Sequence, residues 1–334
     1  MSVDLSTRYL GLELSNPLVV GACPLTGHLT TLERLAIAGA AAAVMPSLFE
    51  EQIEGEDADF HLQLSAKPTF LDQQARLPNM DNYNMGPEGC LRHIELAKKS
   101  LSIPIIGSLN GTSRSGWIKF ARLIEQAGAD ALELNIFLIS TDVTASTQEV
   151  ENCYVDVVAA VRDSISIPLA VKIGPYFAAL PYFAKRLADA GADGLVLFNR
   201  FLEPEFDLDK FHVEPHLELS HHSELRLPLR WIAVLRDQLD VSLAATSGIH
   251  DSRDMVKSLM AGADVSMLAS AILRHGPDHV STMLVGLRRW LEDHEFASVD
   301  SIKGFLSRGK SSDSTAFERA NYMRALSSYT GPFA

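Results

Sequence analysis

The stretch Gln126-Ala-Gly-Ala-Asp-Ala-Leu-Glu-Leu-Asn135 occurs, with variations, four times in the chain. Its counterparts begin at Ile37, Asp189 and Met260, and each has Ala-Gly-Ala followed by a short apolar run. In every copy a helix-like segment stops at the glycine, where a left-handed helix cap costs little, and a strand-like segment follows. The repeat therefore predicts four helix-to-strand units.

A second pattern alternates with this repeat. In each of its four copies a short apolar strand begins beside Pro or a similar breaker, at residues 16–21, 103–109, 167–173 and 241–247. Four copies of each pattern give eight strands separated by helices, and strands connected in this way pair in parallel. Eight parallel strands in about 250 residues close most simply into a (β/α)8 TIM barrel, so the predicted fold class is α/β.

The two ends of the chain are expected to add to the barrel. Residues 3–15 alternate apolar and polar side chains around Gly11, which predicts a β-hairpin that plugs the amino-terminal mouth. Residues 298–334 are predicted to form a helical tail that packs on the barrel. Because the chain has no low-complexity linker, residues 1–334 are expected to form a single domain.

The composition is that of an ordinary globular protein, with 47% hydrophobic and 21% charged residues. A formal net charge of -13 and the lack of a basic run disfavour binding to nucleic acid or to an anionic membrane surface. Cys23, Cys90 and Cys153 form no Cys-x-x-Cys pair, so we expect no disulfide framework, zinc site or iron–sulfur relay within this chain. With no recognisable secretion signal or membrane-spanning run, the sequence predicts a cytoplasmic protein.

Two segments without a regular pattern are expected to be insertions at the carboxyl ends of the strands. Residues 48–88 include the Asn-rich run 78–86, which predicts a lid or a substrate-side wall, although turn chemistry alone also favours Asn and Gly. Residues 201–227 carry a group of four histidines, His212, His216, His221 and His222. These histidines lack a regular ligand spacing with a carboxylate, so no metal site is predicted.

Polar residues follow the predicted strands, at the end where barrel enzymes place their sites. Lys172 lies in an otherwise apolar strand, and a buried ammonium needs an anionic or polar partner. Glu133 is the structural candidate for that partner, and a bound ligand is the functional one. Helices are predicted to start near Asp251 and after Ala269, so a phosphate site is expected beside the last two strands.

The ordered set of motifs resembles the dihydroorotate dehydrogenase family of FMN-dependent barrels over nearly the whole chain. The resemblance rests on the Asn135 strand, the run Val171-Lys172-Ile173-Gly174-Pro175-Tyr176-Phe177, the turn Ser247-Gly248-Ile249, and residues 262–277 and 298–304. No single motif is decisive, but their order and spacing agree with the family. The resemblance implies a flavoprotein oxidoreductase of pyrimidine biosynthesis with FMN as its cofactor.

The resemblance also assigns roles by position. Lys172 corresponds to the lysine beside the flavin N1/O2 edge, where a cation stabilises charge on the reduced cofactor. Gly248 and the pair Ala269-Ser270 correspond to phosphate-holding backbone, where the family commonly has Gly-Gly and Gly-Thr or Gly-Ser. The residues expected at the cofactor are Ala22, Cys23, Ser47, Asn110, Asn135, Lys172, Asn199, Ser247, Gly248, Ala269 and Ser270. Those expected at the substrate are Asn79, Asn82, Asn84, Asn135 and Asn199.

The chain departs from the family at three places. Pro46 stands where a lysine of the second strand is expected, and it cannot donate a hydrogen bond. Leu138 stands where the catalytic Cys or Ser is expected, and losing a positioned base typically costs about 10²–10⁴ in rate. The Asn-rich substrate loop matches only in part, through residues 79–86.

Three hypotheses for the function follow. The first is an FMN-dependent oxidoreductase that oxidises dihydroorotate or a related CH–CH substrate, with Lys172 in the catalytic site and the base shifted to Ser140, Thr141 or Tyr83, or not needed. The second is an FMN-binding or small-ligand-binding barrel without dihydroorotate turnover. The third is a phosphate-sugar aldolase or isomerase that uses Lys172 as a Schiff-base nucleophile. All three predict a small-molecule ligand, and a homodimer is compatible with each.

Overall fold

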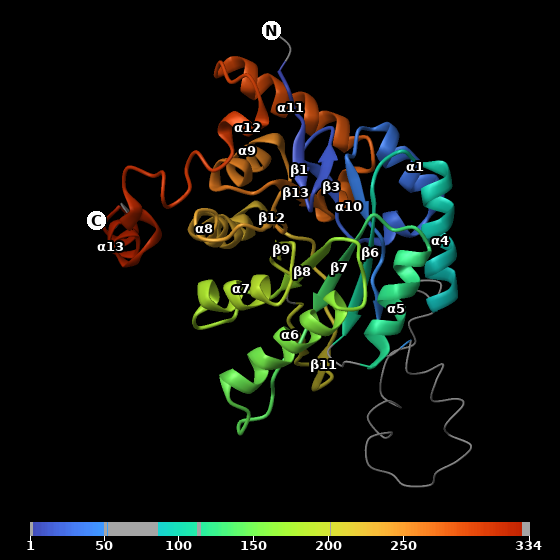
Figure 1. The fold of residues 1–334 in the computed structure, drawn as a ribbon. Helices are drawn as coiled ribbons and strands as arrows, with labels where there is room; N and C mark the ends of the chain where they lie inside the picture. The colour runs from blue at the N-terminus through green and yellow to red at the C-terminus, as the bar shows by residue number, and fades with distance from the viewer. Residues whose placement is uncertain (1–2, 50–51, 53–85, 112–114, 201, 329–334) are drawn as a thin grey trace, which may run out of the picture.

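Figure 1 shows the barrel in a computed structural model that describes residues 3–49, 52, 86–111, 115–200 and 202–328. Eight strands pair in parallel in the order β4, β3, β13, β12, β9, β8, β7 and β6, and β4 also pairs with β6, which closes the ring. The predicted TIM barrel is therefore confirmed. The barrel strands are β3 (Leu18–Val20), β4 (Ala42–Val44), β6 (Ile105–Gly111), β7 (Ala131–Ile136), β8 (Leu169–Ile173), β9 (Gly194–Leu197), β12 (Ser242–Ala245) and β13 (Val265–Leu268).

Helices follow the strands and surround the barrel, as Figure 1 shows. All four repeat glycines have a positive φ, from 94° at Gly128 to 123° at Gly262, so the predicted helix stops are confirmed. The helices are α1 (Leu29–Ile37), α4 (Gly86–Ser100), α5 (Ser115–Gln126), α6 (Thr147–Arg162), α7 (Leu180–Asp189), α8 (Arg226–Leu235), α9 (Ser252–Ala261), α10 (Ser270–His275) and α11 (His279–Asp293). None of the helices in the described part of the chain is both long and apolar enough to cross a bilayer.

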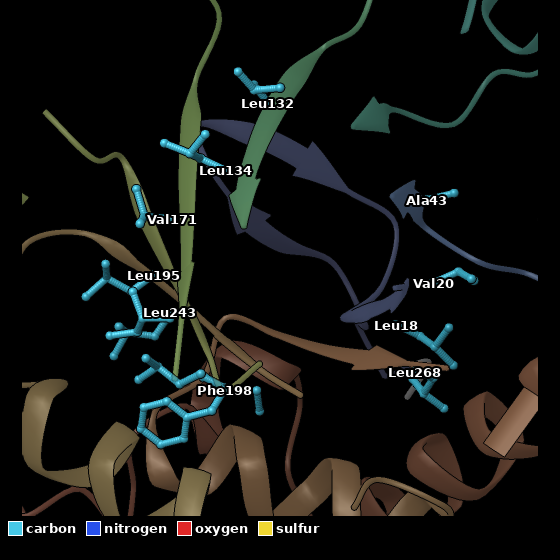
Figure 2. Packing of buried hydrophobic residues seen from close by; sticks show 14 of the residues in the cluster. Leu18, Val20, Ala43, Leu132, Leu134, Val171, Leu195, Phe198, Leu243 and Leu268 are labelled. Atoms are coloured by element: carbon cyan, nitrogen blue, oxygen red, sulfur yellow. The ribbon is translucent and has the colours of Figure 1, made fainter. Parts of the chain in front are cut away.

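Buried apolar side chains form two layers. The outer layer lies between strands and helices and includes Leu134, Val171 and Leu195, which Figure 2 shows at close range. The inner layer lies inside the ring and contains small side chains from several strands, such as Ala131 and Ala244. Each large apolar side chain buried in this way contributes about 1.5–3 kcal/mol, so the outer layer, which holds most of them, contributes most to stability.

The amino-terminal hairpin fills the inner layer at the amino-terminal mouth of the barrel. Its strands β1 (Thr7–Tyr9) and β2 (Leu12–Leu14) pair antiparallel, as predicted. Tyr9 is fully buried within the inner layer, and the backbone N–H of Leu10 donates to Ser242 Oγ at 2.9 Å. The small strand residues leave the space that this plug occupies.

Two sequence-based expectations of irregular structure need correction. Within residues 202–227, which were expected to be irregular, β10 (Glu205–Asp207) pairs antiparallel with β11 (His212–Glu214), and the short 3-10 helix η2 (His222–Leu225) follows. After β4, the two-residue strand β5 (Leu48–Phe49) pairs in parallel with β6. Most of the Asn-rich insertion lies outside the described residues.

The carboxyl-terminal tail packs on the barrel only in part. In α12 (Val299–Ile302) both terminal residues are fully buried against the barrel. In the later 3-10 helix η3 (Ser314–Phe317), the partly buried Phe317 packs against the outer core layer. Helix α13 (Arg319–Ser327) has no buried side chain, and Figure 1 shows it standing apart from the barrel helices. The prediction that the whole tail packs was therefore wrong, because the polar pattern of α13 offers no apolar stripe broad enough to bury.

Candidate functional site

The carboxyl ends of three neighbouring strands bring polar residues into one row. In the sheet register Asn110 on β6 lies opposite Asn135 on β7, and Asn135 lies opposite Lys172 on β8. Residues two apart on a strand share a face, so Glu133 lies one layer deeper on the same face as Asn135. This row explains how three separate strands serve one site.

Lys172 has its ion-pair partner in the barrel interior. Its Nζ lies 3.4 Å from Glu133 Oε1, and the side chain of Glu133 is only 1% exposed. The other carboxylate oxygen, Oε2, has no hydrogen-bond partner within the described part of the chain. Glu133 is therefore the structural partner considered from the sequence, but it satisfies Lys172 only through a long contact.

A pocket of about 160 Å³ opens beside Lys172. It is lined by seven of the residues expected at the cofactor, namely Ala22, Lys172, Asn199, Ser247, Gly248, Ala269 and Ser270. The sequence analysis missed the rest of its lining, which is Phe198, Arg200, Ser220, Thr246, Ile249 and Met267. Most of these are apolar or lie in an insertion, so no polar motif marked them.

A second pocket, of about 470 Å³, adjoins the first. The two share Phe198, Asn199, Arg200 and Ser247 as lining residues. At this junction Asn199 Nδ2 donates to Asn135 Oδ1 at 2.9 Å. Asn135 is thereby oriented by Asn199, which itself lines both pockets.

Hydrogen-bond donors and hydroxyls from three separate segments come together in the lining of the smaller pocket. Ser220 Oγ accepts from the Gly248 N–H at 3.3 Å, and the Ser220 N–H donates to Ser270 Oγ at 3.0 Å. Gly248 has φ 75°, and a Cβ there would lie 2.4 Å from the backbone N of Leu225. This turn therefore requires glycine, both for its conformation and for the close approach of η2.

The profile of the dihydroorotate dehydrogenase family matches residues 4–291. The chain belongs to the dihydroorotate dehydrogenase family. It is 25% identical over 308 residues to a protein named "Dihydroorotate dehydrogenase B (NAD(+)), catalytic subunit" of Methanothermobacter thermautotrophicus, covering 90% of this chain and 97% of that protein. A protein of the same name from Pyrococcus furiosus is 27% identical over 316 residues, covering 92% of this chain and 100% of that protein.

Membership of the dihydroorotate dehydrogenase family confirms the class of protein expected from the sequence. Its members bind FMN and act on CH–CH bonds. A third relative, from Methanosarcina acetivorans, is 27% identical over 301 residues, covering 88% of this chain and 93% of that protein, and carries the same catalytic-subunit name. The family assignment favours an oxidoreductase over the aldolase or isomerase hypothesis.

Several residues that the family resemblance pointed to do not line the pocket. Cys23 is buried at the start of η1 (Pro24–Gly27), where burial raises the pKa of its thiol. Ser47 Oγ lies 2.7 Å from Ser108 Oγ, and both side chains are buried. Asn110 is half-buried at the end of β6, one strand beyond Asn135. None of these three residues lines either pocket.

The position of the family's catalytic base is apolar in the structure as well as in the sequence. Leu138 is partly buried and packs on the outer core layer. Its backbone N–H donates to the Tyr154 hydroxyl at 3.4 Å. Ser140 and Thr141 follow on an exposed segment and line neither pocket. The remaining candidates, Tyr83, Asn79, Asn82 and Asn84, lie outside the described residues.

Two of the four loop histidines, His212 and His222, enter ion-pair clusters that already contain a lysine. His212 and Asp207 lie near Glu214, but Lys210 Nζ is 2.7 Å from Asp207 and 3.2 Å from Glu214. His222 contacts the buried Asp254, which also pairs with Lys257 at 2.9 Å. Because lysine supplies the positive charge in both clusters, neither supports a metal site.

Proposed function

We propose that this protein binds FMN in the two adjoining pockets and oxidises dihydroorotate or a related substrate at a CH–CH bond. Bound FMN would supply a two-electron acceptor. The observation that carries the proposal is Lys172, an ammonium with one long contact to Glu133, which lines the smaller pocket. Arg200, the other cation among the described lining residues, is already paired with Glu224 at 3.0 Å. A cation placed there would stabilise negative charge on a reduced flavin ring.

The donor set fits a flat ring that carries a phosphate tail. Ala22, Phe198 and Met267 contribute apolar lining to the smaller pocket, while Gly248 and Ser270 contribute a backbone N–H and a hydroxyl. Backbone N–H groups and hydroxyls are the usual partners of a phosphate, and apolar walls suit an aromatic ring. The residues present therefore fit FMN, with Lys172 at the ring and Ser220, Gly248 and Ser270 at the phosphate.

An absorption spectrum of the purified protein, followed by anaerobic addition of dihydroorotate, tests the proposal. We expect a flavin spectrum that bleaches when the substrate is added. A protein that retains no flavin from the cell, and takes up none when FMN is added, would contradict the proposal. If the protein retains a flavin that dihydroorotate does not bleach, FMN binding is supported and dihydroorotate is not the substrate.

That last outcome is the second candidate function, an FMN-binding barrel without dihydroorotate turnover. Leu138 favours it, because a partly buried hydrocarbon side chain cannot accept the proton that dihydroorotate must lose. Ser140 and Thr141 remain the proposed replacement bases, and Asn79, Asn82, Asn84 and Asn135 remain the proposed substrate contacts.

The substitution Leu138→Cys separates the two candidates. If only a base is missing, Leu138→Cys should raise the rate of dihydroorotate-dependent flavin reduction by about 10²-fold, whereas Leu138→Ala, the matched control, should not. Stopped-flow absorption of the flavin measures both. Equal rates in the two variants would show that the substrate pocket itself differs from that of a dihydroorotate dehydrogenase.

We further propose that residues 1–334 act as one domain, in the cytoplasm, on a small-molecule substrate. The relatives named above are catalytic subunits, a name that implies assembly with other chains. For this chain we propose a homodimer, and sedimentation equilibrium of the purified protein would distinguish a homodimer from a monomer.

A further inference from the structure

We propose that His250 makes the affinity for the cofactor phosphate depend on pH, by taking up a proton when a phosphate ester binds beside Ser220 and Gly248. His250 is a positioning residue in this proposal, since it acts on the ligand through Ser220. The inference rests on the proposed function, because FMN is the phosphate ester that the pocket is proposed to hold.

Ser220 connects His250 to the end of the pocket where the phosphate would lie. Its side chain is buried, and its Oγ lies 3.2 Å from His250 Nε2. The same Oγ accepts from the Gly248 N–H, and the Ser220 N–H donates to Ser270 Oγ. A change in the hydrogen bonds of the Ser220 hydroxyl therefore affects both the His250 imidazole and the lining of the pocket.

His250 is only 5% exposed, and its Nδ1 is buried without a hydrogen-bond partner among the described residues. Ser220 Oγ accepts from Gly248 and can also donate its own O–H to His250 Nε2. A neutral imidazole that accepts at Nε2 carries its proton on Nδ1, where no acceptor lies. An unsatisfied buried donor of this kind costs about 1–3 kcal/mol.

A bound phosphate would change this hydrogen-bonding arrangement. Phosphate oxygens only accept from N–H and O–H groups, so they would compete for the Gly248 N–H and the Ser220 O–H. Ser220 Oγ would then accept from His250, which requires a proton on Nε2. Both the neutral Nε2–H tautomer and the imidazolium satisfy this requirement, but only the imidazolium adds a positive charge that the anion stabilises.

The charged groups around His250 come from four elements. His222 of η2 has its ring centroid 4.9 Å from that of His250, and Arg274 of α10 is a nearby cation. Asp254 of α9 accepts from the His250 backbone N–H at 3.1 Å and is itself paired with Lys257. His279 of α11 contacts the His250 carbonyl oxygen at 2.9 Å.

Burial, together with the nearby His222 and Arg274, lowers the pKa of His250 from its usual value, and Asp254 only partly opposes this. The imidazole of the ligand-free protein is therefore neutral at neutral pH. A phosphate anion raises that pKa, so binding takes up a proton at any pH between the two values. Affinity should rise as pH falls through this window and level off on either side of it.

The test is the dissociation constant of FMN, measured by ultrafiltration on the full chain freed of flavin, from about pH 8.5 to about pH 5.5. We expect FMN affinity to rise as pH falls, by up to about tenfold per pH unit. Riboflavin, which has the ring but no phosphate, should show no such slope. His250→Gln should remove the slope, and the matched control His294→Gln, at an exposed histidine after α11, should keep it.

Two results would overturn the inference: equal pH slopes for wild type and His250→Gln, or parallel slopes for FMN and riboflavin. The second ionisation of the phosphate, near pKa about 6, acts equally on both variants and cancels in their comparison. If neither flavin binds at any pH, the proposed function itself is contradicted. That result is distinct from FMN binding with a flat profile, which contradicts only the role of His250.

A measurement on the wild type avoids any effect of the substitution on folding. The pKa of His250, followed by NMR of ¹³C-labelled histidine, should rise on addition of FMN and stay constant on addition of riboflavin. A pKa that FMN leaves unchanged would contradict the proposal.

Discussion

The two ends of the barrel each bury a carboxylate against a lysine, but only one of the two carboxylates is fully satisfied. At the amino-terminal end, Asp264 contacts Arg236 at 3.2 Å and Lys303 at 3.2 Å, and it accepts from the backbone N–H of Leu243 at 2.8 Å. At the carboxyl-terminal end, Glu133 has one long contact to Lys172, and its Oε2 has no partner within the described residues.

This difference distinguishes the structural ion-pair network around Asp264 from the ligand-binding site around Glu133 and Lys172. A buried carboxylate surrounded by cations and N–H groups repays its desolvation and fixes the elements that it joins. A buried pair with unused hydrogen-bonding capacity is instead a common feature of places where a ligand binds. The amino-terminal end therefore holds the hairpin, α8 and the tail together, while the carboxyl-terminal end is available for the cofactor.

The largest effect on stability is expected from Asp264→Asn. This change leaves Arg236 and the 8% exposed Lys303 without their shared anion, which should lower the free energy of unfolding by about 3–5 kcal/mol. Urea unfolding measures the loss, and Asp240→Asn is the matched control, because Asp240 is an exposed acid that lines a surface pocket together with Asp264 and Lys303. A loss below about 1 kcal/mol would remove the distinction between the two ends.

A smaller loss of stability, with a large loss of ligand, is expected from Gly248→Ala. The added Cβ would lie 2.4 Å from the Leu225 backbone N, and the left-handed conformation at φ 75° costs a non-glycine residue about 1–2 kcal/mol. The turn should shift, and FMN affinity should fall by about tenfold or more. Unchanged FMN affinity in a folded variant would show that this turn does not hold the cofactor.

The smallest effect on stability is expected from Glu133→Gln. The change removes a buried charge that is poorly satisfied, and Lys172 already lines the smaller pocket. The free energy of unfolding should therefore fall by about 1 kcal/mol or less. The same urea experiment compares it directly with Asp264→Asn. Equal losses at the two ends would contradict the distinction that we draw between them.

The sequence was sufficient to predict the barrel because local and long-range signals agree in it. The four repeat glycines mark helix ends, and the apolar runs between them are too short for anything but strands. The hairpin of β1 and β2 followed from alternation around Gly11 in the same way. The tail was wrongly predicted to pack throughout, since α13 has little apolar periodicity and no local signal told where packing ends.

The site was predictable only where a strand fixes the side chain. Lys172, Asn199 and Gly248 line the pocket, and their positions at strand ends could be predicted because register and turn position follow from the barrel. Ser220 and His250 were missed, because their importance depends on an insertion folding back over β12, and the sequence carries no periodic signal for that contact.

The most direct test of the account is the midpoint potential of bound FMN in Lys172→Met and Lys303→Met, two substitutions that each remove a lysine from a buried carboxylate. The account predicts that Lys172→Met lowers the potential by at least about 30 mV, equivalent to about 1.4 kcal/mol for a two-electron couple, while Lys303→Met leaves it unchanged. An unchanged potential in Lys172→Met, or the same shift in both variants, would contradict the claim that Lys172 serves the flavin.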